Sequence, residues 1–148
     1  ALRVSLSELY QELILDHNRS PRNRGTLAAP THSATGHNPL CGDQLTLELR
    51  LADGKVAEVA FEGSGCAIST ASASLMTDAV KGLDEAELEA LFAKFHALAT
   101  GDGQPAGGLG KLAAFGGIRD YPTRVKCATL AWHTLRAAFH GEQGATTE

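Results

Sequence analysis

The chain has 148 residues, of which 43% are hydrophobic and 20% charged, and its formal net charge is −4 at pH 7. This composition is typical of one globular domain; it excludes wholesale disorder and gives no reason to expect nucleic acid or a membrane surface as a partner. No apolar run approaches the length of a membrane span and no signal segment opens the chain, so we expect a reducing, cytoplasmic location.

The N-terminal segment predicts a helix. Ser5 and Glu8 have the spacing of a capping box, and apolar residues follow at helical spacing, namely Leu6, Leu9, Tyr10 and Leu13. We therefore expect a helix over residues 5–17. It should end before Pro21, because the residue that precedes a proline avoids the helical region. Residues 31–37 are weakly patterned and are compatible with a strand.

The middle of the chain predicts a β-hairpin. Four leucines alternate with polar residues and so share one face of a strand, namely Leu45, Leu47, Leu49 and Leu51. Asp53 and Gly54 form a turn signal, and a second alternating run follows at Ala57, Val59 and Phe61. Two alternating runs on either side of Asp-Gly indicate a pair of antiparallel strands.

The second half of the chain predicts helices. Residues 66–80 are rich in Ala and Ser, whose small side chains would let a helix pack closely on the sheet. Asp84 begins the next helix, which ends at Gly101 and has its apolar stripe at Leu88, Leu91, Phe92, Phe95 and Leu98. The last helix begins near Pro122 and carries Ala128, Ala131, Trp132, Leu135 and Phe139.

Two segments of the second half lack such a pattern. Residues 101–117 are rich in glycine and predict a loop with at most a short helical turn near Leu112. Residues 142–148 predict a disordered tail. Together the elements predict an α+β fold in which a three-stranded antiparallel sheet has helices packed on one face. We expect a single domain over residues 1–148, without repeats or an internal linker.

The cysteines are the most informative residues. Their number is odd, which argues against a disulfide framework, although any one of them could be a small core residue. Cys41 lies in a turn beside Asp43, and Cys66 follows two glycines at the start of a helix, where a thiolate is favoured. Cys127 is next to a lysine and close to Arg124, and cations also favour a thiolate.

Three thiolates and one carboxylate fill a tetrahedral metal site. Zinc accepts this set of ligands, and iron–sulfur clusters use much the same thiolates. The carboxylate of Asp43 would be the weaker and more exchangeable ligand, because oxygen is the harder donor. No C-x-x-C motif occurs, so the fold would have to bring Cys41, Cys66 and Cys127 together.

Three ordered motifs carry a resemblance to a known family, namely NPLCGD (38–43), GSGCAIS (63–69) and RVKCATL (124–130). They resemble the signature segments of the IscU/SufU/NifU-N family, whose members are the U-type proteins of iron–sulfur cluster assembly. The resemblance covers residues 5–140 and is closest to the SufU branch. Lys126 stands where the scaffold branch has histidine, and the stretch between Cys66 and Cys127 is longer, with the extra residues within 101–119. Residues 120–126 replace the Leu-Pro-Pro-Val-Lys segment that chaperones recognise.

The resemblance implies a SufE/NifU-like fold with zinc held by Cys41, Asp43, Cys66 and Cys127. It also implies a partner, a SufS-like cysteine desulfurase that uses pyridoxal phosphate and passes a persulfide to this protein. We expect Cys127 to accept the sulfur. We expect Arg124 to orient that thiol or to dock the partner, the alternative being an ordinary solvated cation. Apo iron–sulfur client proteins or downstream carriers would then receive the product.

Two other functions remain open from the sequence. The protein could be a non-enzymatic scaffold that assembles a [2Fe–2S] cluster on Cys41, Cys66 and Cys127 and hands it on, rather than a zinc-dependent sulfurtransferase. It could also be a structural zinc-binding module without a transfer role. His37, four residues before Cys41, is a candidate for a group that supports the ligands.

Overall fold

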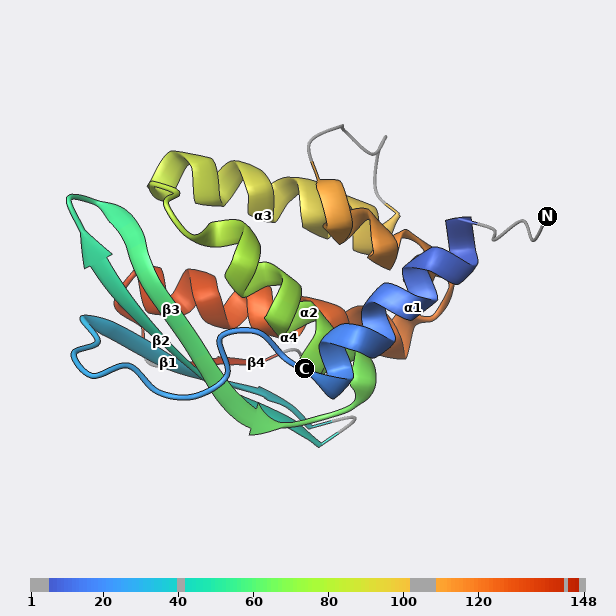
Figure 1. Cartoon of the computed structure of the whole chain (residues 1–148), viewed down its shortest axis with the longest axis horizontal. Coiled ribbons are helices and arrows are strands. Elements are labelled where there is room, and N and C mark those ends of the chain that lie inside the picture. Colours follow the sequence, from blue (N-terminus) through green and yellow to red (C-terminus); the bar gives the residue numbers. More distant parts are fainter. Residues whose placement is uncertain (1–5, 40–41, 102–108, 143, 147–148) are drawn as a thin grey trace.

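The computed structural model describes residues 6–39, 42–101, 109–142 and 144–146 (Figure 1). Its helices lie on one side of a twisted sheet, which leaves the other face of the sheet uncovered by helices. The elements in chain order are α1 (Leu6–Arg19), β1 (His32–Asn38), β2 (Asp43–Ala52), β3 (Lys55–Ser64), α2 (Ala67–Val80), α3 (Glu85–Thr100), the 3₁₀ helix η1 (Gly110–Asp120), α4 (Pro122–Phe139) and β4 (Gly144–Thr146).

The predicted antiparallel three-stranded sheet is confirmed. The strand order is β3-β2-β1-β4, and β2 pairs antiparallel with both β1 and β3. Along β2 the leucines at 45, 47 and 49 are buried while their neighbours face outward, because successive side chains of a strand point to opposite faces. Asp53 and Gly54 both have positive φ, 54° and 76°, as the predicted tight turn between β2 and β3 requires.

The C-terminal segment differs from the prediction. Within residues 142–148, for which we expected disorder, Gly144–Thr146 form β4 and pair in parallel with Thr35–His37 of β1. The segment contains no apolar pattern, so the sequence carries no sign of a strand. The pairing is made by the backbone at the edge of the sheet, and such an edge accepts almost any short extended segment.

The helices follow the sequence prediction closely. α1 continues two residues beyond His17, and α2 covers the Ala- and Ser-rich segment. At the start of α3, Asp84 and Glu87 form a complete capping box, and at its end Gly101 adopts the left-handed conformation. Among the described residues, no helix is long and apolar enough to cross a membrane.

The prediction of a loop over residues 101–117 is wrong for its second part. Residues 102–108 lie outside the described residues, but 110–120 form η1. Leu112, Phe115 and Ile118 are buried on one side of it, each three residues apart. This is the period of a 3₁₀ helix, and the glycines between them conceal it in the sequence. Phe115 packs edge-on against Phe95 of α3.

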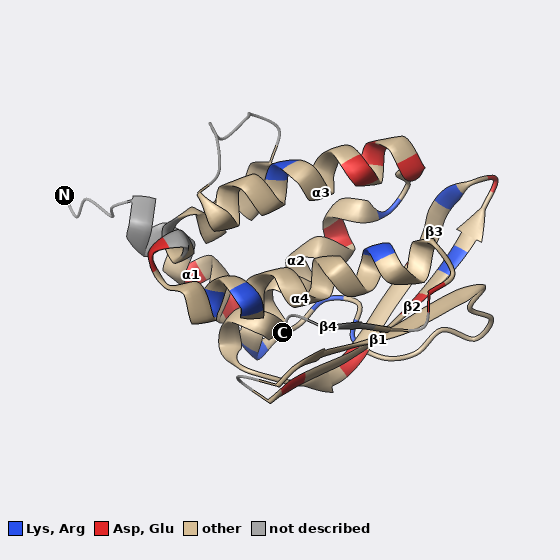
Figure 2. Cartoon of the chain, turned by 180° about the vertical axis from the view of Figure 1, so that it is seen from behind, with Lys and Arg blue, Asp and Glu red and all other residues tan. Residues whose placement is uncertain are grey.

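A single glycine allows α4 to lie directly on the sheet. A Cβ atom at Gly36 of β1 would overlap the Thr134 hydroxyl of α4 and would touch Leu130. α4 thereby crosses β1 and β2 and packs against α2 and α3 on its other sides. Its Trp132 stacks on Phe95, with 4.4 Å between the ring centres, in the middle of the core. Figure 2 shows the charged residues distributed over both strands and helices, with acidic residues at the start of α3.

Candidate metal centre

Three side chains with metal-ligating atoms converge at one end of the sheet. A carboxylate oxygen of Asp43 and the sulfurs of Cys66 and Cys127 all lie within 4.8 Å of one another. They come from three different elements, namely the start of β2, the residue before α2, and α4. The fold thus brings together three of the four predicted ligands. Cys41 lies outside the described residues, so its part in the site stays a prediction.

Asp43 is held in place by hydrogen bonds to both of its oxygens. Oδ1 accepts the backbone N–H of Cys66 at 2.9 Å, and Oδ2 accepts the side-chain amide of Asn38 at 3.3 Å. The residue is fully buried. A buried carboxylate is tolerated only where its charge is hydrogen-bonded or balanced, so these donors set the orientation in which Asp43 faces the two sulfurs.

Cys66 is the N-cap residue of α2. Its backbone is extended, with φ −73° and ψ 170°, and its Sγ accepts the N–H of Ser69 at 3.4 Å. A serine or aspartate oxygen usually takes this position, and here a sulfur does so. The N-terminus of a helix carries partial positive charge, which stabilises negative charge on the sulfur. Cys66 is half-buried, so it faces both Asp43 and the outside.

The glycines before Cys66 are required by close contacts. A Cβ at Gly65 would lie 2.8 Å from Asp43 Oδ1 and 3.2 Å from the Ser69 hydroxyl. At Gly63, φ is +151° and a Cβ would overlap the carbonyl group of Gln44. Only glycine lets the chain leave β3, pass beside Asp43 and enter α2 in so few residues.

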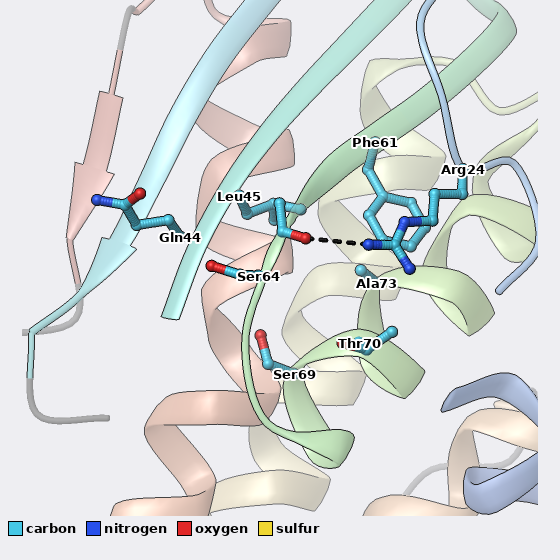
Figure 3. A pocket seen from close by; sticks show the side chains of 9 residues that line it. Arg24, Gln44, Leu45, Phe61, Ser64, Ser69, Thr70 and Ala73 are labelled. Atoms are coloured by element: carbon cyan, nitrogen blue, oxygen red, sulfur yellow. Dashed lines mark hydrogen bonds between the residues drawn. The ribbon is translucent and has the colours of Figure 1, made fainter. Parts of the chain in front are cut away.

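Arg24 anchors the strand end that leads to Cys66. Its guanidinium donates to the carbonyl of Gly63 at 3.2 Å, the bond drawn in Figure 3. The backbone on either side pairs with Phe61 of β3, through Gly25 N–H to Phe61 O and Phe61 N–H to Asn23 O. The side chain lines a small pocket together with Gln44, Leu45, Ser64, Ser69, Thr70 and Ala73 (Figure 3). The segment before β1 therefore holds the end of β3, from which the chain continues to Cys66.

Cys127 is completely buried, and α4 holds it against α2. The hydroxyl of Ser72 on α2 donates to the carbonyl of Ala128 at 2.6 Å and accepts the indole N–H of Trp132 at 3.2 Å. These bonds fix the two helices relative to each other at the level of the sulfurs. The amide of Asn38 donates to Cys127 Sγ at 3.7 Å.

Arg124 lies one helical turn before Cys127 and is exposed. The charge of Cys66, and then a hydrogen bond to Cys127 together with the charge of that sulfur, raise the pKa of Arg124 above its usual value. Its guanidinium is therefore beside both sulfurs, at the outer side of the site. This placement is the one that the proposed orienting role needs, and the role itself stays a prediction.

The residue that supports the ligands is Asn38 and not the predicted His37. His37 is exposed and pairs with Gln44 on the outer face of β1, so it does not support the ligands. Asn38 points to the inner face and contacts two of them. Asn38 belongs to the NPLCGD motif (38–43), and no role for it was predicted from that motif. The alternation of β1 and its pairing with Asp43 were the signals that would have identified it.

The donor set fits a metal such as zinc. In tetrahedral zinc sites the metal lies about 2.3 Å from sulfur and 2.0–2.2 Å from carboxylate oxygen, so ligand atoms are roughly 3.5–4 Å apart. The three donor atoms of this chain lie at most 4.8 Å apart, so they need to move only slightly closer together to reach that spacing. Two thiol groups and one carboxylate suit zinc or iron better than magnesium or calcium, which prefer oxygen alone.

The sequence is similar to known proteins over most of its length. Residues 9–128 match the family described as NifU-like N terminal domain. The chain is 39% identical over 135 residues to "Iron-sulfur cluster assembly scaffold protein IscU" of Streptococcus pyogenes, covering 90% of this chain and 84% of that protein. It is 37% identical over 145 residues to "Zinc-dependent sulfurtransferase SufU" of Bacillus subtilis, covering 97% and 98%.

Solved structures have the same fold. The crystal structure of a putative iron–sulfur cluster assembly scaffold protein for the SUF system of Fervidobacterium islandicum superposes with a TM-score of 0.83 at 31% identity, covering 91% of this chain and 99% of that one. The relatives therefore carry two different descriptions, cluster scaffold and zinc-dependent sulfurtransferase, on one fold.

Proposed function

The chain belongs to the NifU-like N-terminal domain family of iron–sulfur cluster assembly proteins, and within that family we propose that it is a zinc-dependent acceptor of persulfide sulfur from a cysteine desulfurase. The observation that carries the proposal is the convergence of Asp43, Cys66 and Cys127 with the Arg124 guanidinium beside both sulfurs. Cys41, next to Asp43 in the sequence, would be the fourth ligand.

When bound, zinc would keep its thiol ligands deprotonated and shield them from oxidation. Residues of the chain also donate hydrogen bonds to the same sulfurs. Ser69 N–H donates to Cys66, and the amide of Asn38 donates to Cys127. Asp43, an oxygen donor among sulfurs, would be the ligand that zinc exchanges most readily.

Cys127 is the proposed acceptor. Its thiolate attacks the terminal sulfur of the desulfurase persulfide, a new S–S bond forms on Cys127, and the old S–S bond breaks to return the desulfurase cysteine as a thiolate. No oxidant or reductant is needed. Cys127 is buried in the chain alone, so the partner must open the site before transfer. Arg124, the exposed cation beside both sulfurs, is placed to meet a partner that carries negative charge.

A second function has its own support. The relative from Streptococcus pyogenes is named a cluster assembly scaffold, and Cys41, Cys66 and Cys127 would supply the thiolates for a [2Fe–2S] cluster as cargo. Lys126 and the extra residues before Cys127 favour the transferase, because they are departures from the scaffold branch. In either case we place the protein in the cytoplasm, where thiols stay reduced, with apo iron–sulfur proteins or carriers downstream.

One experiment separates these functions. The protein is purified without oxygen, its zinc and iron are quantified, and it is mixed with a SufS-like desulfurase and cysteine. Strong stimulation of the desulfurase by the zinc form, lost in Cys127→Ala, supports sulfur transfer. A coloured cluster that forms at high occupancy and moves to an apo-protein would instead establish the scaffold. A desulfurase that ignores the protein, together with unfolding on zinc removal, would establish a structural module.

A further inference from the structure

Asn38 connects ligands from two separate parts of the fold. It is the last residue of β1, it is completely buried, and it pairs with Asp43, the first residue of β2. Its side-chain Nδ2 lies 3.3 Å from Asp43 Oδ2 and 3.7 Å from Cys127 Sγ. One amide group thus reaches the carboxylate at the start of β2 and the sulfur of α4.

The chemistry of its neighbours determines which way this amide faces. A carboxylate and a thiolate are both acceptors, so the NH₂ group must point toward them. The opposite orientation would place the amide oxygen against two negatively charged atoms. In the observed orientation Oδ1 is buried and has no hydrogen-bond partner among the described residues. A buried acceptor without a partner is unfavourable, so the contacts of Nδ2 outweigh that cost.

We propose that Asn38 is a positioning residue that holds Asp43 and Cys127 together in the arrangement that binds the metal. The inference rests on the metal site of the proposed function. The carboxylate oxygen of Asp43 and the sulfur of Cys127 lie within 4.8 Å of each other, so negative charge on both would be repulsive in a buried site. The NH₂ group of Asn38, which has one hydrogen for each of the two acceptors, offsets this repulsion.

The hydrogen bond to Cys127 has a second consequence. A donor on a metal-bound thiolate withdraws electron density from sulfur, which lowers the energy of its lone pairs. Loss of the donor therefore has a spectroscopic effect that loss of packing does not have. The partners that surround metal ligands typically change metal affinity by about 10–100-fold when they are removed.

The test uses cobalt and zinc ions alone as probes. Wild type, Asn38→Leu and Asn38→Ala are compared, because leucine has the same number and branching of side-chain heavy atoms without an N–H, and alanine leaves room for water. Thr134→Val is the matched control: Thr134 is equally buried, but its hydroxyl donates only to Leu130 of its own helix. The measurements are zinc affinity by competition with a chromophoric chelator, the thiolate-to-cobalt charge-transfer band, and unfolding in urea with chelator.

In Asn38→Leu we expect zinc affinity to fall about 10–100-fold and the charge-transfer band to move to longer wavelength, while Thr134→Val keeps both values of the wild type. If Asn38→Leu does not fold, Asn38→Ala must show both changes in the same direction. Wild-type affinity and wild-type spectrum in a folded Asn38 variant would overturn the inference and leave the metal site standing. Absence of any thiolate-to-cobalt band in the wild type would overturn both the role of Asn38 and the metal site itself.

Discussion

The carboxylate of Asp43 accepts the backbone N–H of Cys66 at 2.9 Å, so the first residue of β2 is bonded directly to the residue that caps α2. Through this bond the position of one ligand determines the position of the next. The chain can approach so closely only because residue 65 is a glycine, since a Cβ atom there would be too near the carboxylate. The contact also makes the site sensitive to a single methyl group.

Gly65→Ala is expected to disrupt the site while sparing the fold. The new Cβ would lie 2.8 Å from Asp43 Oδ1, so the carboxylate or the turn must move and the bond to Cys66 is lost. We expect zinc affinity to drop by at least about tenfold, as for other disturbed ligand supports. Ser64→Ala, at the exposed neighbouring position, is the control. Equal zinc affinity in both variants would contradict this account of Gly65.

Arg124→Ala is expected to reduce sulfur transfer more than metal binding. The guanidinium is exposed and lies beside the sulfurs, but it cannot be a ligand because it is a cation. Stimulation of the desulfurase should fall by about tenfold or more, while the zinc content stays near that of the wild type. Lys126→Ala, two residues along the same helix, controls for loss of a positive charge. A loss of zinc as large as the loss of transfer would assign Arg124 to the integrity of the site instead.

Removing the metal is expected to leave a folded protein. The core residues of β2, α3 and α4, with Leu47, Leu49, Phe95, Trp132 and Leu135 fully buried, are packed without any contribution from a metal. This differs from small zinc domains, whose folding depends on the metal. With chelator present, circular dichroism should keep its helical signal, and thermal unfolding should remain cooperative at a lower midpoint. A non-cooperative transition in the chelated protein would favour the structural zinc module.

Gly36→Ala is expected to destabilise the packing of α4 on the sheet. The added Cβ overlaps the Thr134 hydroxyl, and overpacking of this kind costs about 1–3 kcal/mol. Thr134→Ala removes the overlapping atom, so the double variant should recover part of the loss. Urea unfolding of the two single variants and the double variant measures the coupling. Strict additivity would show that the two residues do not meet.

Stability is expected to fall as the pH is lowered from 7 to 5. Burial, and then the charge of Arg22, hold the pKa of His17 below 6.5, the value of an ordinary histidine. Burial, and then His96, lower the pKa of His133 in the same way. Between these lowered pKa values and 6.5 the unfolded chain therefore binds more protons than the folded one, and each group adds a slope of up to about 1.4 kcal/mol per pH unit in that window.

Substitution of these histidines tests that pH dependence. Urea unfolding in the presence of EDTA keeps metal release out of the measurement. His17→Gln and His133→Gln should each flatten the fall in stability between pH 7 and pH 5, and the double variant should flatten it most. If both single variants keep the slope of the wild type, other groups are responsible for it.

The predicted elements agree with the structure where the signals are local. Alternating leucines identified β2, the Asp-Gly pair identified the turn after it, and Asp84 identified the start of α3. Each of these signals involves residues within a few positions of one another. The sequence offered no signal for β4, whose pairing partner β1 is distant in the chain. It also offered none for η1, where glycines interrupt the spacing of three residues.

The sequence by itself determined which residues are chemically suited to a metal, because thiols and carboxylates in loops and at helix starts can be recognised from neighbouring residues. Only the tertiary structure decided that Asp43, Cys66 and Cys127 meet, that Arg124 lies beside both sulfurs, and that Asn38 rather than His37 supports them. These relationships depend on how α4 packs across β1 and against α2. That packing is a sum of contacts between residues far apart in the chain, which no local pattern encodes.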